Sequence, residues 1–258
     1  ASMAHVSTDA TGRWLLSASY GADMVAVQAI AADGVVAAGR ETATYATGRH
    51  AHSALASPGN HFVLAASLGG GQLHRYRLDA ATGALQPTDP AVFALPAGTG
   101  PRHLRFNARG DRIYLLGELD ALVHVLAWDE VSGGLQLLQS LPTVPPGFAG
   151  PAWGADLHLS PDGRWLYTSE RNSHTLAGFA IDAATGVLTP MGHWHTQLQP
   201  RGFAITPDGR YLVAAGQLSH RVGVHMIAPG NGALTQVGEH DVGLNPNWIT
   251  VLSMPPNA

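Results

Sequence analysis

The chain has 258 residues, of which 45% are hydrophobic and 12% charged, so it can bury a large core and shows no bias towards disorder. Its 14 basic residues, all of them arginine, and its 18 acidic residues give a net charge of −4, which argues against a nucleic acid or a membrane as partner. The lack of Lys and Cys excludes lysine Schiff bases, thiol nucleophiles, disulfides and thiolate metal sites.

No targeting segment is evident in the sequence. No apolar run approaches the roughly 18–20 residues of a transmembrane helix, and residues 1–20 lack the charged and then apolar pattern of a signal peptide. We therefore expect a cytoplasmic protein, and the lack of Cys fits a reducing compartment. Ala1, Ser2 and Met3 resemble a cloning scar.

A turn between two apolar stretches recurs five times along the chain. The repeats are Val6–Leu15, Ala54–Leu64, Leu104–Leu115, Leu157–Tyr167 and Phe203–Leu212. Their turn residues, called the turn anchors below, are Gly12, Asn60, Gly110, Gly163 and Gly209. The anchors are 48, 50, 53 and 46 residues apart, and several short strands in such a period are typical of a β-propeller. We predict an all-β fold, a single propeller domain over residues 1–258 with five repeats of four-stranded blades and an extra C-terminal strand.

Alternation of apolar and polar residues places the strands of each repeat. In the fourth repeat they are predicted at Leu157–Leu159, Trp165–Ser169, Leu176–Ile181 and Leu188–His195. Two Asp-Ala-Ala-Thr-Gly segments, Asp79–Gly83 and Asp182–Gly186, are predicted to be tight turns between third and fourth strands. The Pro-rich segment Leu141–Pro151 is predicted to be a surface loop near the site.

The two ends of the chain do not complete a regular set of blades. The first strand is predicted around Ala4–Val6, and the lone sixth strand is predicted at Trp248–Leu252. Unpaired strand edges attract further strands, so we expect either self-association through exposed blade edges or pairing of Trp248–Leu252 with Ala4–Ser19.

Charged residues recur at equivalent positions of different repeats. Eight residues before the turn anchors lie Ala4, His52, Arg102, Ala155 and Arg201, and eight residues after them lie Tyr20, Leu68, Glu118, Arg171 and Gln217. Residues equidistant from a hairpin turn lie opposite each other, so both sets should occupy the same end of the sheets. The set predicted to converge on one pocket is His52, Arg102, Glu118, Arg171, Arg201 and Gln217.

Several arginines in one pocket predict a site for an anionic ligand, and a His and a Glu beside them can transfer protons. In the alternative interpretation, Arg102 and Glu118 form a purely structural ion pair. Metal sites at His50, His52 and His103, or at Asp156 and His158, are a further alternative, but the spacing of these residues fits no dependable ligand pattern, so we predict no metal. The chain has no Gly-x-Ser-x-Gly elbow, which argues against a serine hydrolase.

Six ordered motifs span nearly the whole chain. They are Gly48–Ser53 (GRHAHS), Gly100–His103 (GPRH), Leu116–Leu119 (LGEL), Trp153–His158 (WGADLH), Gln199–Gly202 (QPRG) and Ala214–Gln217 (AAGQ). Together they make the chain similar to the bacterial 6-phosphogluconolactonase family of seven-bladed β-propellers, to which a fungal carboxy-muconate lactonising enzyme is related. Against the family pattern, roughly the first one to two blades are absent before Ala4.

The resemblance implies hydrolysis of 6-phosphogluconolactone, a small anionic sugar lactone, in the pentose phosphate pathway, without a metal or an organic cofactor. It places the catalytic residues at His52, Arg102, Glu118 and Arg201. We expect Arg102 and Arg201 to hold the anion, and Glu118 or His52 to accept a proton from water. Arg171, Gln217, His103, Asp156 and His158 are expected to contact substrate. The alternatives are a lactonising cycloisomerase, a lactonase for another anionic substrate, or a propeller that only binds ligands or proteins.

Overall fold

The computed structural model describes residues 3–253, with the side chains of residues 37–42 excluded. All regular elements in this range are β-strands, and no helix suited to crossing a membrane occurs among these residues. By its internal contacts, the described chain forms two compact units. Unit 1 extends to Leu119 and includes Leu126–Leu137, while unit 2 comprises Asp120–Val125 and the chain from Leu138 onward.

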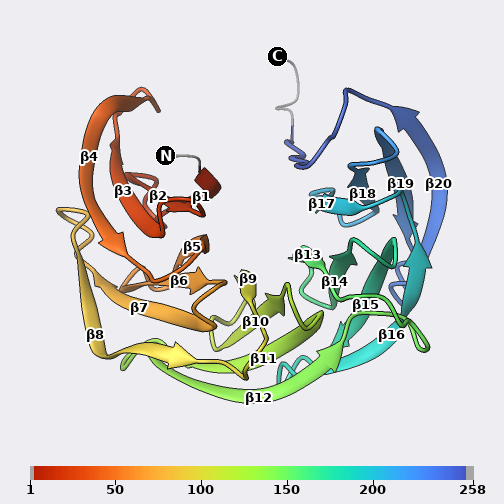
Figure 1. The fold of residues 1–258 in the computed structure, drawn as a ribbon, viewed down its shortest axis with the longest axis horizontal. Helices are drawn as coiled ribbons and strands as arrows, with labels where there is room; N and C mark the ends of the chain where they lie inside the picture. The colour runs from red at the N-terminus through yellow and green to blue at the C-terminus, as the bar shows by residue number, and fades with distance from the viewer. Residues whose placement is uncertain (1–2, 254–258) are drawn as a thin grey trace. The chain divides into compact units, whose positions relative to one another are not determined.

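The strands form five four-stranded antiparallel sheets, each made of strands consecutive in the chain (Figure 1). Sheet 1 contains β1 (Met3–Thr8), β2 (Trp14–Ser19), β3 (Met24–Ile30) and β4 (Val36–Ala46). Sheet 2 contains β5 (Ala51–Ala56), β6 (Phe62–Ser67), β7 (Gln72–Leu78) and β8 (Leu85–Ala94). Sheet 3 contains β9 (Pro101–Phe106), β10 (Arg112–Gly117), β11 (Leu122–Asp129) and β12 (Gly134–Pro142).

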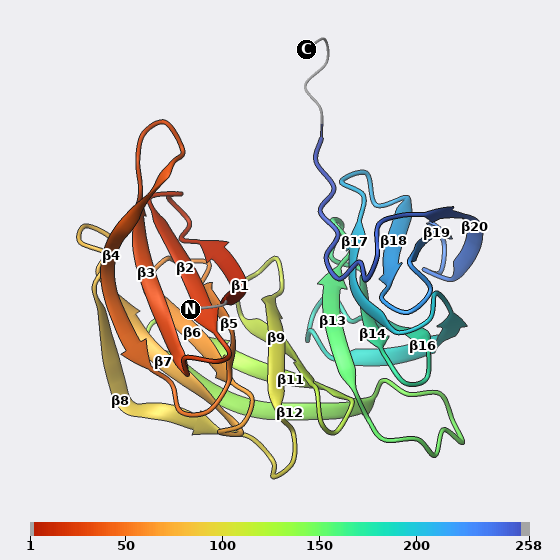
Figure 2. The same cartoon turned by 45° about the horizontal axis from the view of Figure 1, so that its top comes forward.

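Unit 2 holds the other two sheets. Sheet 4 contains β13 (Gly154–Leu159), β14 (Trp165–Glu170), β15 (Thr175–Ile181) and β16 (Leu188–His195). Sheet 5 contains β17 (Pro200–Ile205), β18 (Tyr211–Gly216), β19 (Arg221–Ile227) and β20 (Leu234–Asp241), which run side by side in Figure 2. Such meanders are the blades of β-propellers, so the predicted fold class is confirmed. That residues 1–258 form a single domain stays a prediction.

The predicted turns form as their sequences require. In sheet 4, Trp165 N donates to Ser160 Oγ over 3.0 Å, while the anchor Gly163 adopts a φ of 71°. Tyr211 N donates to Thr206 Oγ1 over 3.0 Å in the equivalent turn of sheet 5. A hydroxyl that replaces a backbone acceptor stabilises such a turn locally, which explains why Ser-Pro-Asp-Gly and Thr-Pro-Asp-Gly begin hairpins.

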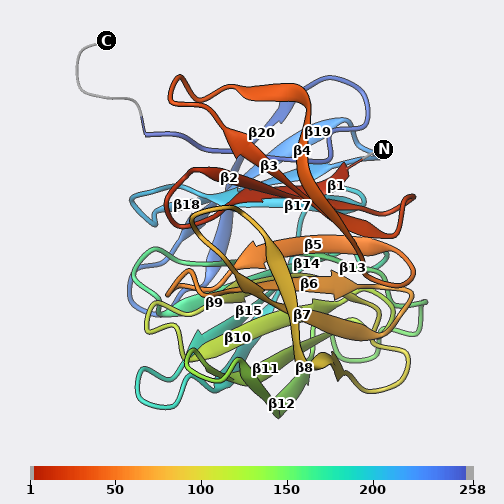
Figure 3. The same cartoon turned by 90° about the vertical axis from the view of Figure 1, so that its left-hand side faces the viewer.

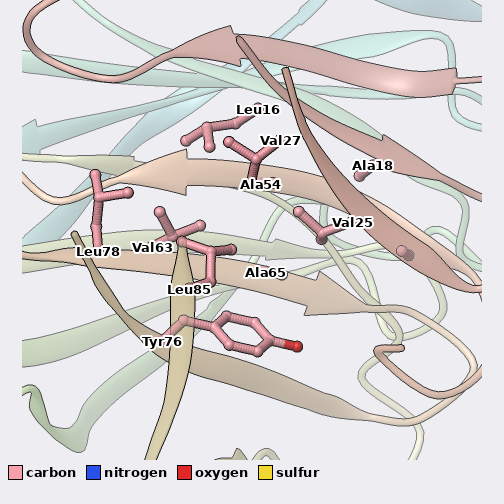
Figure 4. Close-up of a cluster of buried hydrophobic side chains, with 11 residues drawn as sticks. Leu16, Ala18, Val25, Val27, Ala54, Val63, Ala65, Tyr76, Leu78 and Leu85 are labelled. Atoms are coloured by element: carbon pink, nitrogen blue, oxygen red, sulfur yellow. The ribbon is translucent and has the colours of Figure 1, made fainter. Parts of the chain in front are cut away.

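The apolar faces of neighbouring sheets pack against each other. Sheets 1 and 2 are stacked in Figure 3, and Figure 4 shows the cluster between them, in which Leu16, Val27, Ala54 and Val63 are fully buried. A second cluster around Phe62 and Leu115 joins sheets 2 and 3. A third cluster, around Tyr167, Phe203 and Leu212, joins sheets 4 and 5 within unit 2. Removing these faces from water is the main force that holds sheet to sheet.

The first of the two Asp-Ala-Ala-Thr-Gly turns also contacts the neighbouring sheet. The turn at Asp79–Gly83 connects β7 to β8, as predicted, with Gly83 at a φ of 74°. Trp14 Nε1 of sheet 1 donates to the Ala80 carbonyl over 3.0 Å. The ring of Trp14 fills the space beside Gly83, where an added Cβ would meet it at 2.6 Å. The turn thus fastens sheet 2 to sheet 1.

The predicted sixth strand at Trp248–Leu252 is wrong, because these residues adopt no strand. Asn245 has a φ of 57°, and its N–H donates to His220 Nδ1 over 3.1 Å, the same entry turn that Gln199 makes with His174 before β17. The segment therefore begins like a first strand. A strand persists only where a neighbour pairs with its backbone, and no strand within unit 2 pairs with Trp248–Leu252. The pairing of this segment with Ala4–Ser19 of unit 1 stays a prediction.

The segment Leu141–Pro151 connects sheets 3 and 4 and contains no strand after Pro142, in agreement with the predicted loop. Its position relative to the site stays a prediction, as does self-association through blade edges.

Candidate functional site

Every first strand contains a register shift at its beginning. Pairing passes from Ala51 to Ser53 in β5, from Pro101 to His103 in β9 and from Pro200 to Gly202 in β17. The residues that the register skips are Ala4, His52, Arg102 and Arg201, while in β13 the shift spans Ala155 and Asp156. These are the residues eight before the turn anchors. A β-bulge redirects a side chain out of the regular alternation, and three of the predicted site residues, His52, Arg102 and Arg201, are bulged residues.

The bulges change one detail of the predicted geometry. Because Arg102 is the extra residue, it does not lie directly opposite Glu118; instead, Glu118 N donates to the Gly100 carbonyl over 2.8 Å. The two side chains nevertheless meet at the same end of sheet 3, as predicted. Arg102 Nε donates to Glu118 Oε2 over 2.9 Å.

The Arg102–Glu118 ion pair is almost completely removed from solvent. The Arg102 side chain is 3% exposed and the Glu118 side chain 12%. Ser53 Oγ of sheet 2 donates to the Arg102 carbonyl over 2.7 Å and holds the bulge in place. Losing either charge of a buried pair leaves the other uncompensated, so each residue depends on its partner.

Three imidazoles are clustered beside this pair, all within unit 1. The His52 and His103 rings are 5.2 Å apart between centroids, and the His5 and His103 rings 5.5 Å. Arg102 Nη1 lies 3.3 Å from His103 Nε2. His52, His103 and His5 are all buried. The contacts within unit 1 thus join the predicted residues His52, Arg102, His103 and Glu118.

His5 was not predicted as a site residue. It directly follows the bulged residue Ala4, as His103 follows Arg102 and Asp156 follows Ala155. A bulge can bring two consecutive side chains towards the same side, which strict alternation forbids. A search of the seventh position before each anchor, as well as the eighth, would have found it.

The predicted residues of unit 2 form a second group. Asp156 is buried, and its Oδ2 lies 3.1 Å from His158 Nε2. Its Oδ1 accepts a hydrogen bond from Leu157 N over 2.9 Å. Arg201 is half-buried at the bulge of β17. Asp156 and His158 therefore form a hydrogen-bonded acid–imidazole pair at the start of sheet 4.

Arg171 and Gln217 make contacts within unit 2 that hold local structure. The Arg171 guanidinium carbon lies 3.9 Å from the centroid of the Trp153 ring, and Nη2 donates to the Gly154 carbonyl over 2.8 Å. Gln217 Nε2 donates to Asn245 Oδ1 over 3.0 Å. Neighbouring Glu170, which was not predicted, is fully buried and accepts a hydrogen bond from Trp153 N over 2.6 Å. These contacts fix the start of β13 and the segment after β20.

Arg171, Arg201, Gln217, Asp156 and His158 lie in unit 2, whereas the pair and the imidazoles lie in unit 1. The convergence of all of them on one pocket stays a prediction. Among the described residues, no group of three or more His, Asp or Glu side chains is arranged to hold a metal ion. A cleft in unit 2 lies near the turn anchors, between residues that include Pro161, Trp165 and Met226, and none of the predicted site residues lines it.

Four-stranded blades whose bulged first strands carry arginine, histidine and aspartate are those of a β-propeller with polar residues at the starts of its first strands. Over residues 1–251 the sequence matches the family "Lactonase, 7-bladed beta-propeller". The chain belongs to this family.

Among curated proteins, the chain is 39% identical to a 6-phosphogluconolactonase of Pectobacterium carotovorum and 37% identical to one of Serratia proteamaculans, each over 201 residues. Each alignment covers 78% of this chain and 60% of the relative, so the chain spans about 60% of the length of these relatives.

The chain is also similar to solved structures that are named as lactonases. The periplasmic gluconolactonase PpgL of Pseudomonas aeruginosa is 33% identical with a TM-score of 0.87, covering 94% of this chain and 70% of that one. A putative 6-phosphogluconolactonase of Bacteroides fragilis is 27% identical with a TM-score of 0.86, covering 96% and 72% of the two chains.

Proposed function

We propose that this chain carries the site of a lactone hydrolase that opens 6-phosphogluconolactone to 6-phosphogluconate, a step of the pentose phosphate pathway. The observation that carries the proposal is the buried Arg102–Glu118 pair beside the imidazole of His52, in a chain that belongs to the lactonase family. The names of the relatives supply the substrate.

Glu118 is placed to orient Arg102, since its Oε2 already accepts the hydrogen bond from Arg102 Nε. A guanidinium fixed in this way presents its donors in one direction, which suits a phosphate or a developing oxyanion. Arg201, at the equivalent bulge in unit 2, is proposed as the second anion contact. Asp156 and His158, with Arg171, Gln217 and His103, are proposed to shape the substrate site.

We assign general-base catalysis to His52. Imidazole is the side chain most often used to move protons near neutral pH. In the proposed reaction, His52 takes a proton from water while the water oxygen attacks the lactone carbonyl carbon. The tetrahedral oxyanion then collapses, the bond from the carbonyl carbon to the ring oxygen breaks, and the proton passes to that oxygen. The products are a carboxylic acid, which ionises, and an alcohol.

The test is hydrolysis of freshly prepared 6-phosphogluconolactone, corrected for spontaneous opening, by wild type, Arg201→Ala, His52→Gln and the control Arg109→Ala. Arg201→Ala should lower kcat/KM by about 10²-fold through loss of a charged contact, and His52→Gln should lower kcat. Arg109 lies in an exposed turn, so its variant should behave as wild type. Wild-type rates no faster than the spontaneous reaction, or unchanged kinetics in folded Arg201→Ala and His52→Gln, would contradict the proposal.

Two further comparisons refine the substrate and the chemistry. If the arginines bind phosphate, unphosphorylated gluconolactone should be opened less efficiently than 6-phosphogluconolactone. The P. aeruginosa relative is named a gluconolactonase, which favours the opposite order of the two substrates. Prolonged dialysis against a chelator should leave the rate of hydrolysis unchanged, because the proposed steps need no metal. A loss of activity that one divalent ion restores would contradict the metal-free reaction.

The cytoplasmic location predicted from the sequence accords with a pentose phosphate enzyme, although the P. aeruginosa relative is named periplasmic.

A further inference from the structure

An exposed aromatic side chain adjoins the imidazole cluster of unit 1. The Tyr20 ring stacks on the His50 ring, with centroids 4.1 Å apart and planes inclined by 7°. The same Tyr20 ring meets the His52 ring edge-on, at 5.9 Å and 85°. Tyr20 thus lies between a surface imidazole and the proposed general base.

Contacts of His50 hold the Tyr20–His50 stack in place. The backbone of His50 adopts a φ of 63°, and its N–H donates to Asp23 Oδ1 over 2.6 Å. Its ring Nδ1 lies 3.2 Å from the Tyr20 carbonyl oxygen and 3.7 Å from Asp23 Oδ1. The His50 ring is therefore held by the backbone carbonyl of Tyr20 and the carboxylate of Asp23. A ring held in this way can support Tyr20 in one orientation.

Tyr20 differs from the tyrosines that serve the fold. The Tyr167 hydroxyl donates to the Gly232 carbonyl over 2.6 Å, and the Tyr45 hydroxyl accepts a hydrogen bond from Leu85 N over 2.7 Å. Tyr20 is 38% exposed, and its hydroxyl makes no hydrogen bond to any residue within the described range. A partly exposed tyrosine with a supported ring is typical of a binding surface rather than a core.

The repeat places Tyr20 with residues already in the site. It lies eight residues after its turn anchor, the position of Glu118 in sheet 3. In sheet 3 this position meets the bulged Arg102, and in sheet 1 it meets the bulged His52 of the neighbouring sheet. The same structural position therefore supplies a side chain to the bulge in both sheets.

We propose that Tyr20, supported by His50, is a substrate-positioning residue that packs against the C–H face of a sugar lactone ring and presents its hydroxyl to a ring substituent. A sugar ring has both an apolar face and polar edges, which match the face and the hydroxyl of a tyrosine. The inference rests on the proposed lactonase function and adds a subsite for the ring to the arginine sites for the anion. Placed beside His52, the platform would bring the lactone carbonyl near the proposed base.

The test compares Tyr20→Leu, which keeps an apolar side chain without an aromatic face, with Tyr20→Phe, which keeps the face. For 6-phosphogluconolactone, Tyr20→Leu should raise KM about tenfold while kcat changes less than about threefold, and Tyr20→Phe should raise KM by less than about threefold. His50→Ala, which removes the support but leaves Tyr20, should fall between them. Thermal melting establishes that each variant is folded.

Binding of 6-phosphogluconate, measured by calorimetry and by saturation transfer to the sugar protons, separates the platform from the reaction. Weaker binding and weaker transfer in Tyr20→Leu support the platform, even if wild type hydrolyses no lactone. A hydrolysing wild type whose KM and product affinity are unchanged in Tyr20→Leu and His50→Ala would overturn the platform and leave the proposed function standing. Wild type that neither binds the product nor hydrolyses the lactone would overturn both.

Discussion

Arg102 and Arg75 are both buried, yet their charges are accommodated differently. Arg102 pairs with a carboxylate. Arg75 donates to the backbone carbonyls of Gly133 and Pro90, and burial lowers its pKa. An arginine nevertheless stays protonated, so the Arg75 charge is solvated by carbonyl dipoles instead of a counter-ion. The Arg102–Glu118 pair lies in the candidate site, whereas the Arg75 contact with Gly133 joins β7 to the turn before β12.

Glu118→Gln should separate the role of charge from that of shape. Glutamine keeps the size and one acceptor, but it removes the negative charge that pairs with buried Arg102. We expect kcat/KM to fall by about 10²-fold and the free energy of unfolding to drop by about 2 kcal/mol. Urea unfolding and lactone hydrolysis measure the two effects. The matched control is Asp111→Asn, which breaks a surface ion pair and should cost less than about 1 kcal/mol. Equal effects of the two variants would refute this assignment.

Arg75→Met should show that Arg75 is a structural residue. The substitution keeps much of the buried stem but removes the charged hydrogen bonds to two carbonyls, so unfolding should become easier by about 2–3 kcal/mol. Arg77, two residues along β7, is exposed and stacks on Phe62 at 4.9 Å. Arg77→Met should cost no more than about 1 kcal/mol. A smaller loss for Arg75→Met than for Arg77→Met in denaturant unfolding would show that the carbonyl contacts are unimportant.

At the scale of the elements, each sheet has a β-bulge in its first strand, and the bulge interrupts the alternation of side chains between the two faces of the sheet. A second recurring feature is the turn between the third and fourth strands, which joins neighbouring sheets. The bulges carry candidate site residues, whereas the turns join the sheets of the scaffold. The two functions therefore lie on different segments of each repeat.

Substituting Gly83 tests the turn contact. In Gly83→Ala the new Cβ would meet the Trp14 ring at 2.6 Å, and the residue would also keep a φ of 74°. Gly12→Ala is the matched control, since Gly12 has a φ of 68° and no atom within 4 Å of an added Cβ. The control should cost about 1 kcal/mol for backbone strain alone. Gly83→Ala should cost about 1–3 kcal/mol more because of overpacking. Equal unfolding free energies would mean that Trp14 moves aside freely.

At the scale of the whole molecule, buried histidines make both units sensitive to acid. Burial lowers the pKa of His74 in unit 1 and of His193 and His225 in unit 2. In the unfolded chain these imidazoles titrate near the ordinary value of about 6.5. Below that pH the unfolded state binds more protons than the folded state, so stability decreases as the pH falls.

We therefore expect the free energy of unfolding to be constant above about pH 7 and to decrease from about pH 6.5 downward until the folded-state pKa values are passed. Urea titrations between pH 8 and pH 5 measure this dependence. His225→Gln should make the decrease shallower, whereas His240→Gln, at an exposed position, should leave it unchanged. A stability that rises on acidification, or a His225→Gln profile parallel to wild type, would show that these imidazoles do not govern it.

The sequence alone determined the scaffold and indicated candidate site residues. Strand positions, turns and the repeat follow from local signals, because alternation and turn chemistry act over a few residues. His52, Arg102, Glu118 and Arg201 could be found because a repeat makes unusual residues visible at equivalent positions, and the matching motifs supplied the family.

Only the tertiary structure decided the features that depend on pairing. A bulge exists only relative to the opposite strand, so the contacts of His103 with His5 and His52 are established only by the structure, although His5 shares a repeat position with His103 in the sequence. The position of Tyr20 depends on stacking on His50, which lies in the connection before the first strand of the next sheet. Trp248–Leu252 has the apolar residues of a strand but adopts none, because backbone hydrogen bonds require a neighbour and alternation along one segment cannot supply it.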